Sequence, residues 1–104
     1  MDRISVLEGF LAEDPDDPFN SYALALEYLK SDNKRARDLF EDLLNKNPNY
    51  LPTYYAFAQL LAEQQDPGAA DIFRQGIEIA SRADDQKTLK ELANAYNDWL
   101  FEQS

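Results

Sequence analysis

Apolar residues recur along this chain with the period of an α-helix. Between residues 36 and 44 they fall at intervals that place all of them on one side of a helix. This apolar stripe consists of Ala36, Leu39, Phe40, Leu43 and Leu44. No segment alternates between apolar and polar residues as a half-buried strand would. The pattern predicts an all-α fold, with helices over about residues 2–13, 18–30, 34–46, 52–64, 68–82 and 86–102.

The apolar stripe occurs twice. A shift of 33 residues carries the stripe that begins at Ala36 onto a second stripe that begins at Ala69. The same shift relates the helices that precede the two stripes. The equivalent pairs are Leu24 and Phe57, Ala25 and Ala58, Tyr28 and Leu61, Ala36 and Ala69, and Phe40 and Phe73. A whole two-helix unit is therefore repeated in register, and a period of this length is typical of helical repeat proteins.

Helix-start signals agree with these bounds. Asp17 and Asp66 are each followed by proline, which predicts a capping oxygen and then a first helical position that needs no N–H. Pro52 is expected to open the first helix of the second unit. The segment SDNK at residues 31–34 and the pair Asp84–Asp85 offer caps for two further helices.

The repeated unit resembles the tetratricopeptide repeat (TPR) family. That family carries a large residue, a leucine, a small residue and an aromatic on its first helix, then Ala-x3-Phe and a closing proline. The second unit reads Tyr54-x2-Phe57-Ala58-x2-Leu61 and Ala69-x3-Phe73, and the first reads Ser21-x2-Leu24-Ala25-x2-Tyr28, Ala36-x3-Phe40 and Pro48. The resemblance covers about residues 18–81. It implies a right-handed α-solenoid whose hairpins pack through Leu24, Ala25, Tyr28, Ala36, Phe40, Phe57, Ala58, Leu61, Ala69 and Phe73.

The two ends of the chain have the patterns of half repeats. Ile4, Leu7, Phe10 and Leu11 have the spacing of a second-of-pair helix. Leu89-x2-Leu92-Ala93-x2-Tyr96 repeats the first-of-pair pattern. We therefore expect one TPR-like domain over residues 1–104: an N-terminal helix at 1–14, repeats at 15–47 and 48–81, and a capping helix at 84–104. Trp99 is interpreted as a lid over the last hairpin.

Composition narrows the function. Twenty acidic and ten basic residues give a net charge of −10, which disfavours nucleic acid and anionic membranes as partners. Cysteine and histidine are absent, which excludes thiolate metal sites, cysteine nucleophiles and the commonest general base. No basic leader and no apolar run of membrane-spanning length occurs, so a soluble, cytoplasmic protein is expected.

Carboxylates are the remaining candidates for catalysis or metal binding. The densest run is EDPDDP at residues 13–18. It lacks the spacing of a calcium loop, and a proline-rich turn offers no pocket to desolvate one acid of a pair. The run is therefore interpreted as a helix-capping turn, and we expect a protein that is not an enzyme, with no cofactor and no metal.

The resemblance implies that the first helix of each pair lines a groove that holds a peptide or helix of a partner protein. The implied groove residues are Phe19, Tyr22, Leu26, Leu29, Tyr55, Gln59, Ala62, Lys90, Asn94 and Asn97. Tyr22, Leu26, Tyr55 and Gln59 are expected to form one row, because the two pairs are related by the repeat shift. Chaperone-binding members clamp a carboxylate with Lys-x3-Asn on their first groove helix. Here only Lys90-x3-Asn94 fits, which disfavours that partner.

Three alternatives remain for what covers the apolar groove row on the helix at 18–30. They are a partner peptide, a second copy of the chain in a homodimer, and the helix end that carries Phe101. The expected function is therefore a TPR adaptor or scaffold that binds a partner. The alternative is a self-associating structural module that uses the same row as a dimer seam.

Overall fold

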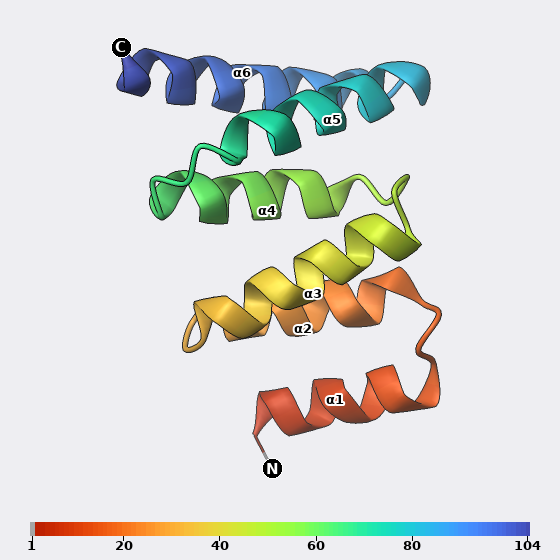
Figure 1. Ribbon diagram of the computed structural model, residues 1–104. Coiled ribbons are helices and arrows are strands. Elements are labelled where there is room, and N and C mark those ends of the chain that lie inside the picture. The colour runs from red at the N-terminus through yellow and green to blue at the C-terminus, as the bar shows by residue number, and fades with distance from the viewer. Residues whose placement is uncertain (1) are drawn as a thin grey trace. The chain divides into compact units, whose positions relative to one another are not determined.

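The computed structural model describes residues 2–104, so Met1, the first residue of the expected N-terminal segment, lies outside it. Six helices occupy this part of the chain (Figure 1). They are α1 (Arg3–Glu13), α2 (Pro18–Tyr28), α3 (Asn33–Lys46), α4 (Pro52–Glu63), α5 (Ala69–Arg82) and α6 (Gln86–Gln103). No strand occurs within residues 2–104, which confirms the all-α prediction. Each helix end lies within two residues of its predicted position.

Aspartates begin most of these helices. The carboxylate of Asp17 accepts a hydrogen bond from the backbone N–H of Phe19 at 3.0 Å, and Pro18 follows it at the first helical position. Asp32 and Asp85 accept from the N–H groups three residues ahead, at 3.2 and 3.1 Å. Each carboxylate satisfies one of the N–H groups that a helix start leaves without a partner. The sequence predicted these three caps.

The expected cap at Asp66–Pro67 was wrong in one respect. Helix α5 begins at Ala69, and its N-cap position is Gly68, which has no side chain to donate or accept a bond. The Asp66 carboxylate instead accepts from the Gly68 N–H at 2.8 Å. Asp66 therefore holds a tight turn that leads into the helix, and Pro67 lies in this turn, before the first helical residue.

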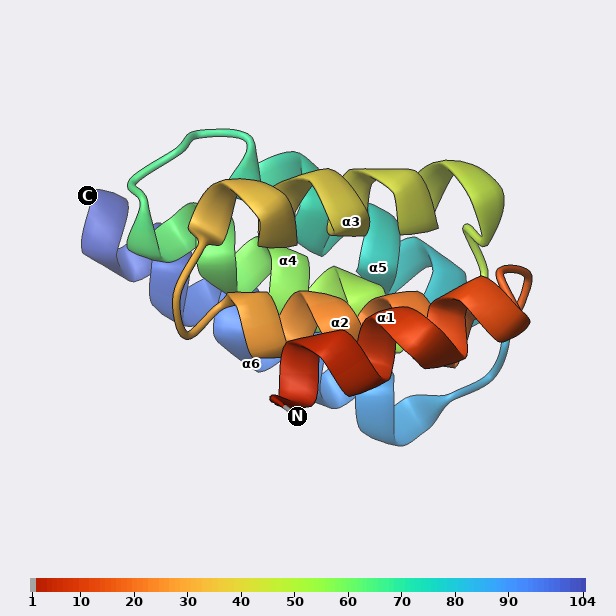
Figure 2. The same cartoon turned by 90° about the horizontal axis from the view of Figure 1, so that it is seen from below.

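The chain divides into two compact units, Met1–Thr53 and Tyr54–Ser104. In the first unit, α1 and α3 pack against different sides of α2 (Figure 2). Ala25 of α2 and Ala36 and Phe40 of α3 are completely buried. Small side chains let the two helices of the hairpin approach closely, and the Phe40 ring fills the space beside them.

Side chains of α2 form polar contacts with α1. The amide of Asn20 donates to the backbone carbonyls of Phe10 at 3.3 Å and Asp14 at 3.1 Å, so it satisfies acceptors at the end of α1. Near the other end of α1, the Arg3 guanidinium pairs with the Glu27 carboxylate at 3.0 Å.

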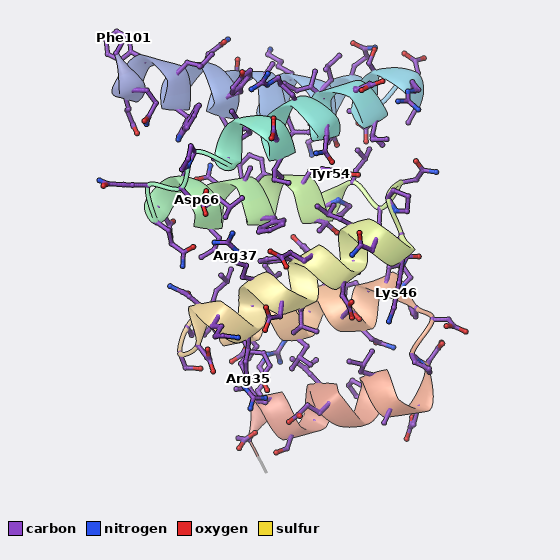
Figure 3. The ribbon with its side chains drawn as sticks, viewed as in Figure 1. Arg35, Arg37, Lys46, Tyr54, Asp66 and Phe101 are labelled. Carbon is purple, nitrogen blue, oxygen red and sulfur yellow. The ribbon has the colours of Figure 1, made fainter. Side chains whose placement is uncertain are left out.

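The second unit contains the other hairpin and the last helix. Helix α5 packs against α6, and Tyr54 lies on the side of α4 that faces α5 (Figure 3). Ala58, Ala69 and Leu92 are completely buried, and Phe73 is nearly so. In the two units together, all ten residues expected to pack the repeats are buried.

Candidate functional site

The second unit contains an open cavity of about 420 Å³. One wall is a face of α4, on which Tyr55, Gln59 and Ala62 recur at helical spacing. All three were among the expected groove residues. They share this side of α4 because the residues between them, including Phe57 and Leu61, are turned into the core and are almost fully buried.

Helix α6 forms the other wall. The residues that it contributes are Glu91, Asn94, Ala95, Asp98, Trp99 and Glu102. Of the expected groove residues on this helix, the structure brings Asn94 to the cavity, whereas Lys90 and Asn97 do not line it. The sequence reasoning did not assign the three acidic residues to the groove. Their spacing of seven and four residues, which places them on one helix face, was a signal that could have identified them.

Three aromatic rings pack together beside the cavity, and two of them, Phe73 and Trp99, line it. The ring centroid of Phe73 in α5 lies 5.6 Å from that of Tyr96 and 6.4 Å from that of Trp99. Tyr96 and Trp99 stack on each other at 6.3 Å. The buried Nε1 of Trp99 has no hydrogen-bond partner among the described residues, so ring packing holds the indole in place. Trp99 therefore packs over the last hairpin, as the sequence predicted, and also lines the cavity.

The cavity is negatively charged. Three carboxylates line it, and no lysine or arginine is among the described residues that do. Tyr55, Gln59 and Asn94 add a hydroxyl and two amides that can donate and accept hydrogen bonds. The arrangement can thus offer a partly exposed ring, neutral hydrogen-bonding groups and negative charge to one bound segment.

The expected groove residues of the first unit are divided between different surroundings. The Tyr22 ring meets the Tyr50 ring edge-on at 5.8 Å, and burial raises the pKa of the Tyr22 hydroxyl. Leu29 lies just beyond α2, which ends at Tyr28, two residues earlier than predicted. Leu26 and Phe19 remain 38% and 58% exposed. Of this expected row, Tyr22 is therefore in contact with another ring of the unit, whereas Leu26 and Phe19 are accessible.

Phe19 lies at the edge of a second cavity, of about 410 Å³, between α1 and α2. Phe10, Leu7 and Ala23 line the same cavity, which makes it mostly apolar. Phe10 is 51% exposed. The spacing of Phe10 predicts only a packing role, and nothing in that spacing distinguishes it from Leu7, the buried residue of α1.

The helix end that carries Phe101 does not bury this ring. Phe101 is 82% exposed and projects from the end of α6 (Figure 3). Of the three covers left open for the apolar row of α2, the Phe101 ring is therefore not supported. Across residues 2–104, no group of three or more acidic side chains is arranged to hold a metal ion. None of the described helices is both long and apolar enough to cross a membrane.

No protein-family model and no curated protein matches the sequence. Solved structures do match. The solution NMR structure of a tetratricopeptide repeat domain protein from Salinibacter ruber is 44% identical, with 83% of this chain and 89% of that chain covered and a TM-score of 0.77. A crystal structure of a tetratricopeptide repeat domain protein from the same organism is also 44% identical, with 80% and 94% covered and a TM-score of 0.73. The solution structure of a Bordetella parapertussis protein is 23% identical, with 98% and 90% covered and a TM-score of 0.83, and supports the fold alone.

Proposed function

The chain belongs to the tetratricopeptide repeat family, and on this premise we propose that it is a non-catalytic protein-interaction module that holds a partner's peptide or helix in the cavity between α4 and α6. Tyr55 is its aromatic anchor. Gln59 and Asn94 bind polar groups of the segment, and Ala62 leaves space for it.

The exposure of Tyr55 is the observation that carries the proposal. Its ring is 42% exposed at the cavity, while Phe57 and Leu61 of the same helix are only 3% and 2% exposed. The core of the unit is therefore closed without the Tyr55 ring. A large ring that the core does not need, at the edge of an open cavity, is typical of a residue that gains its packing from a partner.

The polar side chains that line the cavity favour an extended or helical peptide segment as its ligand. The side-chain amides of Gln59 and Asn94 each offer two donors and one acceptor group. A peptide that leaves water needs partners for its own backbone N–H and C=O groups, and these amides can supply them from opposite walls. A cavity of about 420 Å³ accommodates one or two large side chains of such a segment.

Selection from a random peptide library tests the proposal. Peptides selected on the unaltered protein should bind Tyr55→Ala about 5- to 150-fold more weakly, since loss of an aromatic anchor is worth about 1 to 3 kcal/mol. The control is Gln75→Ala, which changes an exposed residue of α5 that does not line the cavity. If selected peptides bound both variants as tightly as the unaltered protein, the groove would not be the binding site.

Self-association is a second candidate function, and a specific surface favours it. Phe10, Phe19 and Leu26 of the first unit are 51%, 58% and 38% exposed, and exposed patches of large apolar side chains are uncommon on a stable monomer. Sedimentation velocity at two concentrations tests this candidate. A homodimer predicts a sedimentation coefficient that rises with concentration and falls for Phe19→Ser, whereas one constant monomer value for both proteins would exclude it.

A further inference from the structure

We propose that the segment bound between α4 and α6 is basic, with lysine or arginine side chains that pair with Asp98, Glu102 and Glu91. This inference deepens the proposed function and rests on it. It specifies the charge of the partner, which membership of the family does not determine.

The acidic residues at the cavity differ from those on α3 and α5 in having no cation of their own. On α3, Lys34 pairs with Asp38 at 3.4 Å and Arg37 with Glu41 at 3.3 Å. On α5, Arg74 pairs with Asp71 at 3.7 Å. Each of these carboxylates is neutralised by a residue three or four positions away on the same helix.

Glu91, Asp98 and Glu102 have no such partner. In the part of the chain that the structure describes, none of the three side chains forms an ion pair or a hydrogen bond. For Asp98 and Glu102 the sequence explains the difference, because residues 91–104 contain no lysine or arginine. The only cations of α6 are Lys87 and Lys90, which precede all three acids and do not line the cavity. The wall therefore presents uncompensated negative charge.

The spacing of the acids suits a peptide. A helix rises about 1.5 Å per residue, so Glu91 and Asp98 are separated by about 10 Å along α6, and Asp98 and Glu102 by about 6 Å. Alternate side chains of an extended peptide point the same way and are about 7 Å apart. Residues four apart on a bound helix are separated by about 6 Å. Either form allows two cationic side chains to reach Asp98 and Glu102 at the same time.

The rings of the cavity strengthen the preference for a cation. Tyr55 of α4 and Trp99 of α6 line the same space as the carboxylates. The face of an aromatic ring attracts lysine and arginine, and a planar guanidinium can stack on a ring while it donates hydrogen bonds to a carboxylate. A peptide with acidic side chains, or one bound through a free carboxylate end, would meet like charge on the α6 wall. The net charge of −10 also attracts basic segments during encounter.

Matched synthetic peptides and two double variants test the inference. The probe is a peptide of about twelve residues, acetylated and amidated, with leucine anchors and two arginines separated by one residue. Two further peptides carry glutamine or glutamate in place of both arginines. Binding is measured by calorimetry and by the fluorescence of Trp99, the single tryptophan of the chain, in about 0.15 M salt to screen distant charges.

Asp98→Asn/Glu102→Gln removes two negative charges from the cavity. Glu13→Gln/Asp16→Asn removes two from exposed positions that do not line it. We expect the arginine peptide to bind the cavity variant about tenfold more weakly than the unaltered protein and the control variant within about twofold, since local ion pairs are lost only in the first. The glutamine peptide should bind weakly to all three proteins, and the glutamate peptide more weakly still.

Two results would overturn the basic partner while leaving the groove proposal intact. In the first, the glutamine or glutamate peptide binds as tightly as the arginine peptide, and Tyr55→Ala still weakens it. In the second, the two double variants lose the same affinity, so that the attraction comes only from total charge. If no peptide of any charge bound in a manner sensitive to Tyr55→Ala, the proposed function itself would fail, and the inference with it.

Discussion

Gly76 of α5 lies directly against Tyr54 of α4: a Cβ atom added to Gly76 would stand 2.6 Å from the Tyr54 Cβ and 3.0 Å from the Leu92 Cδ1. Neither neighbour can yield easily, because the Tyr54 Cβ is bonded to the backbone and Leu92 is completely buried. The repeat shift makes Leu43 equivalent to Gly76 and Ser21 equivalent to Tyr54. In the first hairpin the larger residue of this pair is Leu43, on the second helix. In the second hairpin the larger residue is Tyr54, on the first helix.

This contact predicts opposite effects for the same substitution at two glycines. Gly76→Ala should lower the free energy of unfolding, because overpacking of a closed core costs about 1 to 3 kcal/mol and outweighs the better helix propensity of alanine. Gly9→Ala in α1 should raise it by up to about 1 kcal/mol, because no atom lies within 4 Å of the added methyl group. Urea denaturation measures both. An equal increase in the free energy of unfolding for the two variants would show that the Gly76 site has room for a methyl group.

Close helix approach predicts that Ala36→Leu and Ala69→Leu are each destabilising by about 1 to 3 kcal/mol, since a branched chain is forced into a site that is already full. Both alanines are completely buried. Ala12→Leu, on an exposed position of α1, is the control and should change stability by less than about 0.5 kcal/mol. Thermal and urea unfolding should agree. If neither core substitution changed the stability, the helices of the hairpins would not pack closely at these alanines.

The end of α4 offers a stabilising substitution. Gln65 has a φ of 57°, in the left-handed region that favours glycine. The N–H of Gln65 bonds the Ala62 carbonyl at 3.0 Å and that of Asp66 bonds the Leu61 carbonyl at 2.8 Å, which is the pattern of a Schellman cap. Gln65→Gly should therefore raise stability by up to about 1 kcal/mol. Gln75→Gly, in the interior of α5, should lower it by about as much, and a loss at both positions would contradict the prediction.

The cap of α6 predicts a pH dependence. The backbone N–H of Thr88 donates to the Asp85 carboxylate at 3.1 Å, and the Thr88 hydroxyl donates to it at 2.8 Å. These bonds, the backbone one most, hold the pKa of Asp85 below the ordinary value of 3.8. A carboxyl group whose pKa is lower in the folded state stabilises the fold above its unfolded pKa and loses this contribution as the pH falls through the folded pKa. The contribution should be full at pH 7 and disappear well below pH 4.

Asp85→Asn isolates this group, because asparagine can still cap the helix but does not titrate. The melting temperature of the unaltered protein should exceed that of Asp85→Asn at neutral pH, and the difference should shrink in acid. Asp16→Asn, at an exposed position in a turn, supplies the baseline for other charge effects. A difference that stayed constant from neutral to acidic pH would show that the Asp85 charge does not contribute.

Local signals in the sequence were sufficient for the helices and for the residues that they bury. Asp17, Asp32 and Asp85 mark helix starts because a cap needs only a side-chain oxygen within a few residues of the N–H that it accepts. Ala36 and Ala69 are found in the core because each belongs to an apolar stripe that its own helix generates. Both kinds of signal depend on residues that are close in sequence.

The lining of the cavity depended on the tertiary structure. The sequence assigned Lys90 and Asn97 to a groove, whereas the α6 residues that line the cavity in the structure include Glu91, Asp98 and Glu102. Successive residues of a helix are about 100° apart around its axis, so a small difference in rotation exchanges a lysine for a carboxylate at the wall. That rotation is fixed by the packing of Leu92, Tyr96 and Trp99 on α5, between residues that are distant in sequence. The repeat pattern therefore predicted that a helix of the first-of-pair kind follows α5, and only the packing of that helix decided which charge it presents to the cavity.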